Sequence, residues 1–360
     1  MKNPAALNRT MPVLQALAAA ILFGASAPFA KLLLGGIEPV LLAALLYLGS
    51  GVGLLALRFV LNTSRPIVQA EAPLARSDTP WLAGAIAAGG IAAPIVLLFS
   101  LRNTPAASAA LLLNFEGVAT TLLALLVFQE EVSRRTLWSV ALVTVASVIL
   151  TLDPAAGWGF SVGAIGIVLA CILWGIDNNL TRNVSGKDPL AIVTIKGLAA
   201  GAVSLVLAVV LGNRLPDLST VLGAMLLGCL SYGLSIVLFI RAMRALGAAR
   251  TSTLFGVSPL AGVALSLVIF RDLPGWVFWL ALLLMVAAAL LLLNEEHEHD
   301  HFHELLVHDH SHAHDDGHHE HSHGTAQAVR HSHQHRHEQA RHAHPHVPDI
   351  HHRHGKKARK

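Results

Sequence analysis

The sequence predicts an all-α integral membrane protein of ten transmembrane helices, followed by a disordered C-terminal tail. The first observation is composition: the 360 residues are 54% hydrophobic and 13% charged, with a mean hydropathy of +0.59. Such a chain is too apolar for an ordinary soluble domain. The second observation is that all 22 histidines lie between His297 and His354. The third is that the two halves of the apolar region repeat one another.

Ten stretches are long and apolar enough to cross a bilayer, which takes roughly 20 residues per helix. They cover residues 12–34, 39–61, 80–101, 105–128, 134–152, 160–181, 189–212, 218–241, 248–270 and 275–293. Most connections are short, so neighbouring helices are expected to be antiparallel. Ala25-Ser26-Ala27 resembles a signal-peptidase site, but more apolar helix follows it, so we expect the first stretch to be retained.

The distribution of basic residues predicts that both termini are cytoplasmic. If the N-terminus is inside, the inner segments hold twelve Lys and Arg and the outer segments four. Lys and Arg are enriched in cytoplasmic loops, which supports this orientation. An even number of spans returns the tail to the same side. We therefore expect a multi-pass protein of a bacterial-type inner membrane, in contact with lipid.

Short motifs recur in both halves in the same order, at an offset of 151 residues for the early motifs and 142 for the later segment. The pairs are Leu22-Phe23-Gly24 with Leu173-Trp174-Gly175, Lys31 with Arg182, and residues 106–128 with residues 248–270. With five helices per half, the second copy enters the membrane from the opposite side. This predicts two inverted five-helix repeats with a substrate site between them near the midplane. The predicted units are a first repeat at 12–152, a second repeat at 160–293 and a cytoplasmic tail at 294–360.

These motifs resemble the EamA-type transporters of the drug/metabolite transporter superfamily, which consist of two five-helix halves. The resemblance covers residues 12–293 and includes two segments that run from small residues into an acidic residue. These segments are Leu113-Asn114-Phe115-Glu116-Gly117 to Glu130-Glu131, and Phe255-Gly256-Val257-Ser258-Pro259 to Asp272. The family often has a proline in both fourth helices; Pro259 fits, whereas the first copy has Gly117. The resemblance implies transport of small organic solutes, often outward, without ATP hydrolysis.

Three ionisable residues within the predicted spans are the main functional candidates, because a charge in the membrane is costly. Glu116 is interpreted as a proton-coupling carboxylate, a contact for a cationic substrate group, or a carboxyl that fixes helix packing. Asp177 and Lys196 lie at similar depth and can form either a structural ion pair or a substrate-binding pair. The further candidates are Asn114 and Asn178 beside these residues, Lys31 as an end anchor or substrate contact, and Trp174 as a cavity-lining or packing residue.

Small residues recur at helix-packing spacing in the second and seventh predicted helices. Gly49 and Gly53, and likewise Gly197 and Gly201, are four residues apart, which lets helix backbones approach closely. This packing can occur within one chain or between chains, so the oligomeric state stays open, and we favour packing within the chain. Cys171 and Cys229 lie in apolar stretches, which excludes a disulfide framework.

No enzyme motif is present. The sequence lacks a P-loop lysine motif, a His-Glu-x-x-His pair and a Gly-x-Ser-x-Gly elbow, and residues 1–293 contain no histidine. We therefore expect no catalysis, no required cofactor and no nucleic-acid partner. Transport coupled to protons, or facilitation, fits the sequence better than an ATP-driven pump.

The histidine-rich tail is predicted to bind divalent metal ions. Alternating imidazoles can supply nitrogen ligands to Zn, Ni, Co or Cu ions. The candidate ligands are His297, His299, His301, His303, His308, His310, His312 and His314. The charged composition cannot bury a core, so residues 294–360 are expected to be disordered without metal.

The sequence thus favours an exporter of small metabolites or drug-like solutes with a metal-binding regulatory tail. A body without histidine is a poor pathway for such metals, because borderline ions need histidine, cysteine or several carboxylates. Two alternatives stay open. One is a divalent metal cation transporter, and the other is a membrane-anchored metal buffer or sensor.

Overall fold

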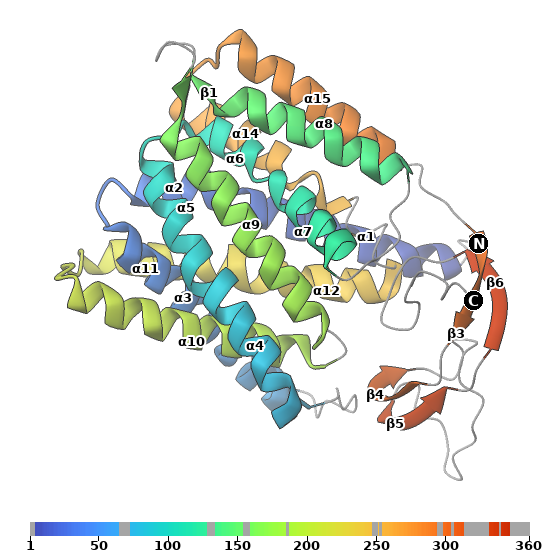
Figure 1. Ribbon diagram of the computed structural model, residues 1–360. Helices are drawn as coiled ribbons and strands as arrows, with labels where there is room; N and C mark the ends of the chain where they lie inside the picture. The colour runs from blue at the N-terminus through green and yellow to red at the C-terminus, as the bar shows by residue number, and fades with distance from the viewer. Residues whose placement is uncertain are drawn as a thin grey trace.

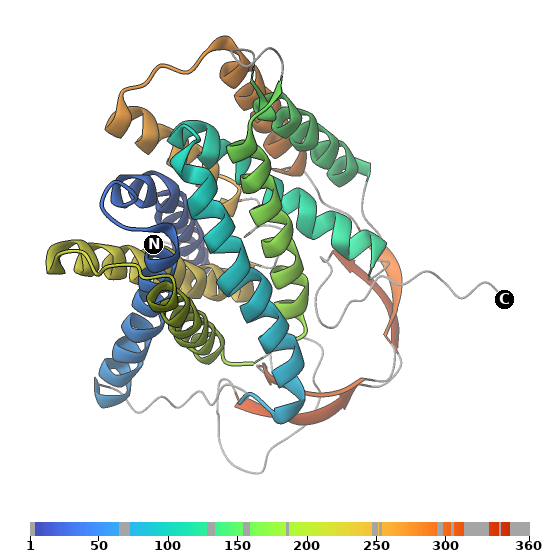
Figure 2. The same cartoon turned by 60° about the vertical axis from the view of Figure 1, so that its left-hand side comes forward.

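The computed structural model shows a bundle of helices that cross one another at large angles (Figures 1 and 2). It describes residues 4–64, 73–127, 134–153, 159–184, 187–246, 251, 254–293, 298–303, 306–312, 331–337 and 340–345. The helices of the first half are α1 (Pro4–Gly24), α2 (Ser26–Leu33), α3 (Pro39–Ser64), η1 (Arg76–Asp78), α4 (Thr79–Ala85), η2 (Ile86–Ala92), α5 (Ala93–Arg102), α6 (Ala106–Leu112), α7 (Phe115–Leu126) and α8 (Arg134–Thr151).

A two-residue antiparallel ladder, β1 (Leu152–Asp153) with β2 (Gly159–Phe160), connects the two halves. The helices of the second half are α9 (Val162–Arg182), α10 (Pro189–Val210), α11 (Leu218–Leu227), η4 (Gly228–Leu234), α12 (Ser235–Leu246), α14 (Ser258–Phe270) and α15 (Trp276–Leu293). Apart from this ladder, the described part of the membrane body is helical.

Eight described helical stretches are long and apolar enough to cross a membrane. They are Met11–Leu33, Pro39–Val60, Arg76–Arg102, Ala106–Leu126, Arg134–Thr151, Val162–Arg182, Pro189–Val210 and Leu218–Ala242. Two shorter apolar helices, Ser258–Phe270 and Trp276–Leu291, lie in the ninth and tenth predicted spans. The count of ten crossings therefore stays a prediction.

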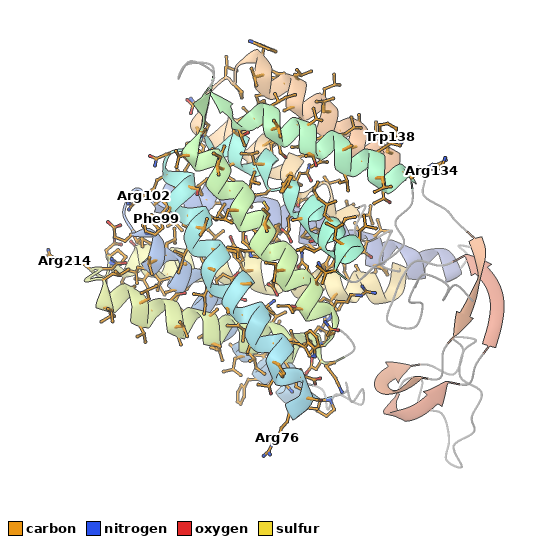
Figure 3. The ribbon with its side chains drawn as sticks, in the orientation of Figure 1. Arg76, Phe99, Arg102, Arg134, Trp138 and Arg214 are labelled. Atoms are coloured by element: carbon orange, nitrogen blue, oxygen red, sulfur yellow. The ribbon has the colours of Figure 1, made fainter. Side chains whose placement is uncertain are left out.

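The outer surface of the bundle is apolar along the helices and basic at their ends. Phe99 and Trp138 project outward from the sides of α5 and α8, with exposed fractions of 48% and 67% (Figure 3). Arg102 and Arg214 lie toward the same end of the bundle, and Arg134 lies toward the opposite end (Figure 3). Large exposed aromatic side chains such as these are suited to contact with lipid rather than with water.

The third long helix of each half contains a π-helical segment at an equivalent position. The segments η2 and η4 both have seven residues, and their starts, Ile86 and Gly228, are 142 positions apart. This equals the offset at which the fourth helices match in sequence. A π-helical segment is rare and frequently lies at a functional site.

The fourth helix of each half is interrupted within the bundle. In the first half, turn residues Leu113 and Asn114 separate α6 from α7. In the second half, Gly256 and Val257 precede α14. The first interruption therefore forms without a proline, and Gly117, which stands where the family often has that proline, lies inside α7.

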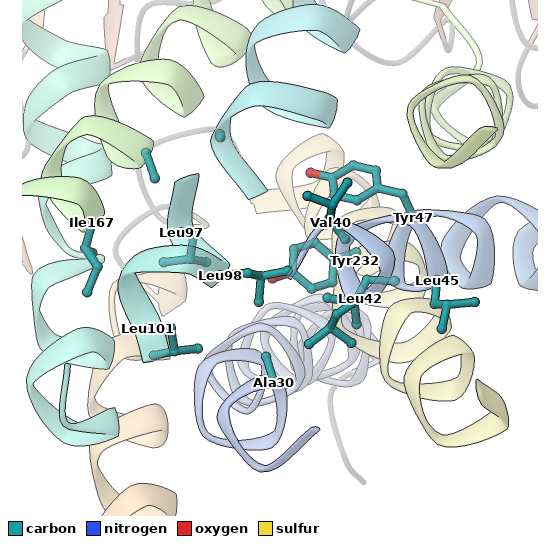
Figure 4. Packing of buried hydrophobic residues seen from close by; sticks show 14 of the residues in the cluster. Ala30, Val40, Leu42, Leu45, Tyr47, Leu97, Leu98, Leu101, Ile167 and Tyr232 are labelled. Carbon is teal, nitrogen blue, oxygen red and sulfur yellow. The ribbon is translucent and has the colours of Figure 1, made fainter. Parts of the chain in front are cut away.

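The glycine pairs pack within the chain, as favoured from the sequence. A Cβ atom on Gly197 would lie 2.7 Å from the backbone nitrogen of Gly51, and one on Gly49 would overlap the carbonyl oxygen of Met225. Helix α3 is thus held by backbone contact against both α10 and the α11–η4 helix. The core joins both halves at this centre, where Tyr47 and Tyr232 pack with Leu42 and Val40 (Figure 4).

Gly228→Ala is expected to lower the free energy of unfolding by about 1–3 kcal/mol, the usual cost of overpacking. The added methyl group would overlap the carbonyl oxygen of Leu46, and a backbone atom in a packed helix has little room to move. Thermal unfolding of the purified protein in detergent measures the effect. Gly223→Ala in α11 is the matched control, since nothing lies within 4 Å of its added methyl group; equal melting temperatures for the two variants would contradict the prediction.

The described part of the tail departs from the expected disorder. Strand β3 (Glu298–His303) pairs antiparallel with β6 (Ala340–Pro345), and β4 (Leu306–His312) pairs antiparallel with β5 (His331–His337). Histidine at every second residue matches the two-residue period of a strand. A backbone ladder needs no buried core, so the argument from composition did not foresee it. His297 and His314 lie outside the described residues.

Candidate functional site

Polar side chains gather on one face of α9, near its end. Trp174 and Asp177 are buried, whereas the side chain of Asn178 is exposed. The neighbouring helices α7 and α10 carry Glu116 and Lys196. Residues three and four apart share a helix face, so Trp174, Asp177 and Asn178 project toward the helices packed around α9.

Asp177 and Lys196 form an ion pair inside the bundle. The Nζ atom of Lys196 lies 2.5 Å from Oδ1 of Asp177, and the two side chains are 16% and 10% exposed. Thr181 donates a hydrogen bond to the same carboxylate oxygen at 2.8 Å and accepts one from Lys196 at 3.1 Å. The two residues that the sequence placed at similar depth are therefore in contact, and their charges offset each other.

Glu116 lies across from α9 and is held by an amide. Asn178 Nδ2 donates to Oε1 of Glu116 at 2.8 Å and to the Thr120 hydroxyl oxygen at 3.1 Å. Among the described side chains, no basic group lies within ion-pair distance of Glu116. The Glu116 side chain is half-buried.

The interruption before α7 explains why Glu116 can occupy this place. Its backbone N–H bonds to the carbonyl of Leu113 at 3.1 Å, three residues back, instead of to Leu112. The thiol of Cys171 lies 3.7 Å from the carbonyl oxygen of Leu112 that this shift leaves free. Glu116 thus sits in the first turn of α7, where the helix dipole favours a negative charge.

Three other candidates bond to partners other than Glu116. Asn114 Nδ2 contacts the sulfur of Met285 at 3.5 Å, toward α15. Lys31 donates to the carbonyl oxygens of Leu101, at 2.9 Å, and of Thr104. Leu101 lies in the last turn of α5 and Thr104 follows that helix, so Lys31 caps a neighbouring helix. Trp174 donates its ring N–H to the carbonyl of Gly89 at 3.0 Å.

Lys31→Met is expected to lower the free energy of unfolding by about 1.5–3 kcal/mol, the range for hydrogen bonds to charged groups. The methionine chain keeps the length of the lysine but removes a charged donor from two carbonyl oxygens. Thermal unfolding in detergent is the measurement, with Lys31→Arg as the conservative control. An unchanged melting temperature together with loss of solute binding would instead assign Lys31 to the substrate.

Sequence reasoning missed the residues that join the site to the surrounding helices. The Tyr47 hydroxyl donates to the carbonyl of Gly89 at 2.7 Å, and its ring lies 5.6 Å from that of Tyr232. Asn179 Nδ2 donates to the carbonyl of Thr120 at 3.1 Å, which ties α9 to α7 a second time. One signal was available: the two tyrosines of the chain both lie within predicted spans, in the second and eighth helices.

Comparison with known proteins decides the family. The EamA-like transporter family matches twice, at residues 10–152 and 161–294. The chain belongs to this family. An uncharacterized transporter of Methanothermobacter thermautotrophicus is 28% identical over 278 residues, covering 74% of this chain and 81% of that protein. A crystal structure of a protein aligns with a TM-score of 0.58 at 19% identity, covering 79% of this chain and 96% of that chain, and supports the fold alone.

As an EamA-like transporter, the chain is a multi-pass membrane protein that moves small solutes and is not an enzyme. Its two EamA copies pack against each other reciprocally through the repeated Leu-aromatic-Gly motif. A Cβ atom on Gly24 would lie 3.1 Å from the Cβ of Ala261 in the second copy, and one on Gly175 would lie 2.9 Å from the Cβ of Ala119 in the first. Ala119 and Ala261 are again 142 positions apart. Glu116 and Asn178 therefore meet at the interface between the copies.

Proposed function

We propose that this EamA-like transporter exports a small polar or amphipathic organic solute by a secondary mechanism in which Glu116 takes up a proton or a cationic group of the solute. The observation that carries the proposal is a half-buried carboxylate at an interrupted helix between the two copies, with an amide and no basic side chain as its described partner. Discontinuous helices near the midplane commonly form such sites in secondary transporters.

The charges around Glu116 favour binding of a positively charged ligand. The Asp177–Lys196 pair is neutral as a unit, so the ionised Glu116 leaves the cluster with a net negative charge. The described groups around the carboxylate that can titrate or bond are Asn178, Thr120, Asp177, Lys196, Cys171, Tyr47 and Tyr232. Phe23 packs against Tyr232, with ring centroids 6.1 Å apart. An organic amine with an apolar body fits this combination of one carboxylate and aromatic rings.

Reconstituted vesicles test the proposal with a panel of amino acids, organic amines, nucleosides and divalent metals. The full chain is compared with a variant that ends at Asn294. We expect flux of one or more organic amines, stimulated by a pH gradient, in both proteins. Flux of metal that survives removal of the tail would favour a metal transporter, and no flux of any solute would overturn the transport proposal for this panel.

The orientation of the chain and the identity of its membrane are also part of the proposal. The shared end of Arg102 and Arg214, opposite Arg134, agrees with the sidedness inferred from basic residues. We infer cytoplasmic termini in an inner membrane. Reporter fusions at both termini of the full chain are expected to report the same, cytoplasmic side, and fusions on different sides would contradict both this topology and an even number of crossings.

We further propose that the tail binds divalent metal and regulates the transporter instead of feeding it. The strand register places histidines opposite one another at His299–His344, His301–His342, His308–His335, His310–His333 and His312–His331. Cross-strand neighbours have Cβ atoms about 4.5–5.5 Å apart, a separation that suits two imidazoles on one ion. Among the side chains that the structure describes, no three His, Cys, Asp or Glu residues group as a metal site, so support for metal is confined to the tail.

Equilibrium dialysis with Zn²⁺ tests the tail. The full chain is expected to bind zinc and the variant ending at Asn294 to bind none. If the two proteins retain equal zinc, the metal-binding proposal fails. If only the full chain binds zinc and its solute flux is the same with and without the metal, the tail buffers metal and does not regulate transport.

A further inference from the structure

The π-helical segment η2 leaves one backbone carbonyl free at the centre of the bundle. In this segment Ala93 N–H bonds to Ala88, five residues back. The next residue, Pro94, has no N–H, so Gly89 has no donor from its own helix. Its carbonyl accepts instead from Tyr47 of α3 and Trp174 of α9. A carbonyl of the first copy thereby holds a side chain of the second.

The second copy repeats this connection in the opposite sense. Ser231 of η4 is the residue 142 positions after Gly89, and its hydroxyl donates to the carbonyl of Leu22 in α1 at 2.6 Å. Leu22 and Leu173 are equivalent in the repeated motif, next to Phe23 and Trp174. Each π-helical segment therefore binds the first helix of the other copy.

Gly89 also fixes the position of Asp177. A Cβ atom on Gly89 would overlap both Oδ2 and the Cβ of Asp177, so the absent side chain leaves the space that Asp177 occupies. Asp177 must stand there to reach Lys196. The same α9 turn carries Asn178, the partner of Glu116. One glycine thus sets the position of Trp174, Asp177 and Asn178 relative to α7.

We propose that Gly89 is a positioning residue of the transport site, acting through its free carbonyl on Trp174 and Tyr47 and through its missing side chain on Asp177. This inference rests on the proposed function of the Glu116 cluster. It assigns to η2 the role of holding the α9 turn in register with Glu116 while the two copies contact each other.

The test uses Trp174 as the reporter in the full-length protein. A background with Trp174 as its single tryptophan replaces the other five with phenylalanine. Four of them, Trp81, Trp138, Trp276 and Trp279, are exposed on the described surface, and Trp158 lies outside the described residues. In this background Gly89→Ala is expected to shift Trp174 emission to longer wavelength and to raise its acrylamide quenching about twofold or more, because the displaced Asp177 turn opens the indole to water. Flux of the amine that the parent carries best is expected to fall about tenfold, as misplacement of positioning groups can cost more than this.

Two further variants separate positioning from general loosening. Gly223→Ala, in open space on α11, is expected to leave emission and flux unchanged. Gly89→Ala with Asp177→Gly and Lys196→Met restores space for the methyl group without leaving the Lys196 charge uncompensated. Trp174 emission is therefore expected to return to the parent value even though flux does not. Unchanged emission in Gly89→Ala, or no recovery in this combined variant, would overturn the positioning role. If no panel solute is carried by the parent, the proposed function fails while the emission results still decide the role of Gly89.

Discussion

Asp177→Ala is expected to lower the free energy of unfolding by about 3–5 kcal/mol, the cost of leaving one partner of a buried ion pair uncompensated. Without the carboxylate, Lys196 keeps its charge in the bundle with the Thr181 hydroxyl as its described partner. Unfolding by denaturant or heat in detergent measures the loss. Lys196→Met alone is expected to lower the free energy of unfolding by a comparable amount, since it leaves the buried Asp177 carboxylate without its cation.

The double variant Asp177→Ala with Lys196→Met is the decisive control. Replacing both members of a buried pair by apolar groups is often neutral or stabilising. We therefore expect the double variant to recover most of the stability lost in each single variant. Additive losses would show that the pair does not act as a unit. Flux in this stable double variant then decides between the two functions left open by the sequence: retained flux means a structural pair, and lost flux means a substrate-binding pair.

Glu116→Gln is expected to abolish the response of transport to pH and the accumulation of solute against its gradient. The glutamine oxygen still accepts from Asn178 at the position of Oε1, so the helix contact is kept while the exchangeable proton is lost. Flux in reconstituted vesicles over a series of pH values, with and without a pH gradient, is the measurement. The variant would then act as a carrier without proton coupling, and we expect it still to exchange labelled solute across the vesicle membrane.

Thr120→Val is the matched control for this substitution. It removes the second acceptor of Asn178 but leaves the carboxylate in place. We expect its flux to keep the pH response of the parent. If Glu116→Gln also keeps that response, Glu116 is a packing carboxyl and the coupling proposal is wrong.

The sequence was sufficient to locate the charged groups but not their surroundings. Charge inside an apolar span is conspicuous because of its cost, so Glu116, Asp177 and Lys196 were found from the sequence. The π-helical segments were not, because a span that is apolar on all sides has no hydrophobic periodicity from which an extra residue in a turn can be detected. The bond from Tyr47 to Gly89 depends on this irregularity.

Two candidates show why the partner that a side chain contacts is harder to predict than its place in a helix. Asn114 is two residues from Glu116, yet it contacts Met285 because the interruption before α7 turns the two side chains to different neighbours. Lys31 was expected near a helix end and lies there, but its partners are carbonyl groups at the end of α5, about 70 residues away in the chain. Local patterns do not specify which distant backbone atoms will lie nearby.

The reciprocal contact of the two copies has a consequence for biogenesis. Helix α1 is synthesised first, but residues Ala19 and Leu22 bond to Ser235 and Ser231, more than 200 residues later. The face of α1 that carries these carbonyls must therefore remain in the bilayer without its native neighbours until residue 235 of the 360 has been synthesised. Pairings between distant segments slow folding. A chain stopped after its first half is accordingly expected to be a substrate for membrane quality-control proteases, and co-expression of the missing half should protect it.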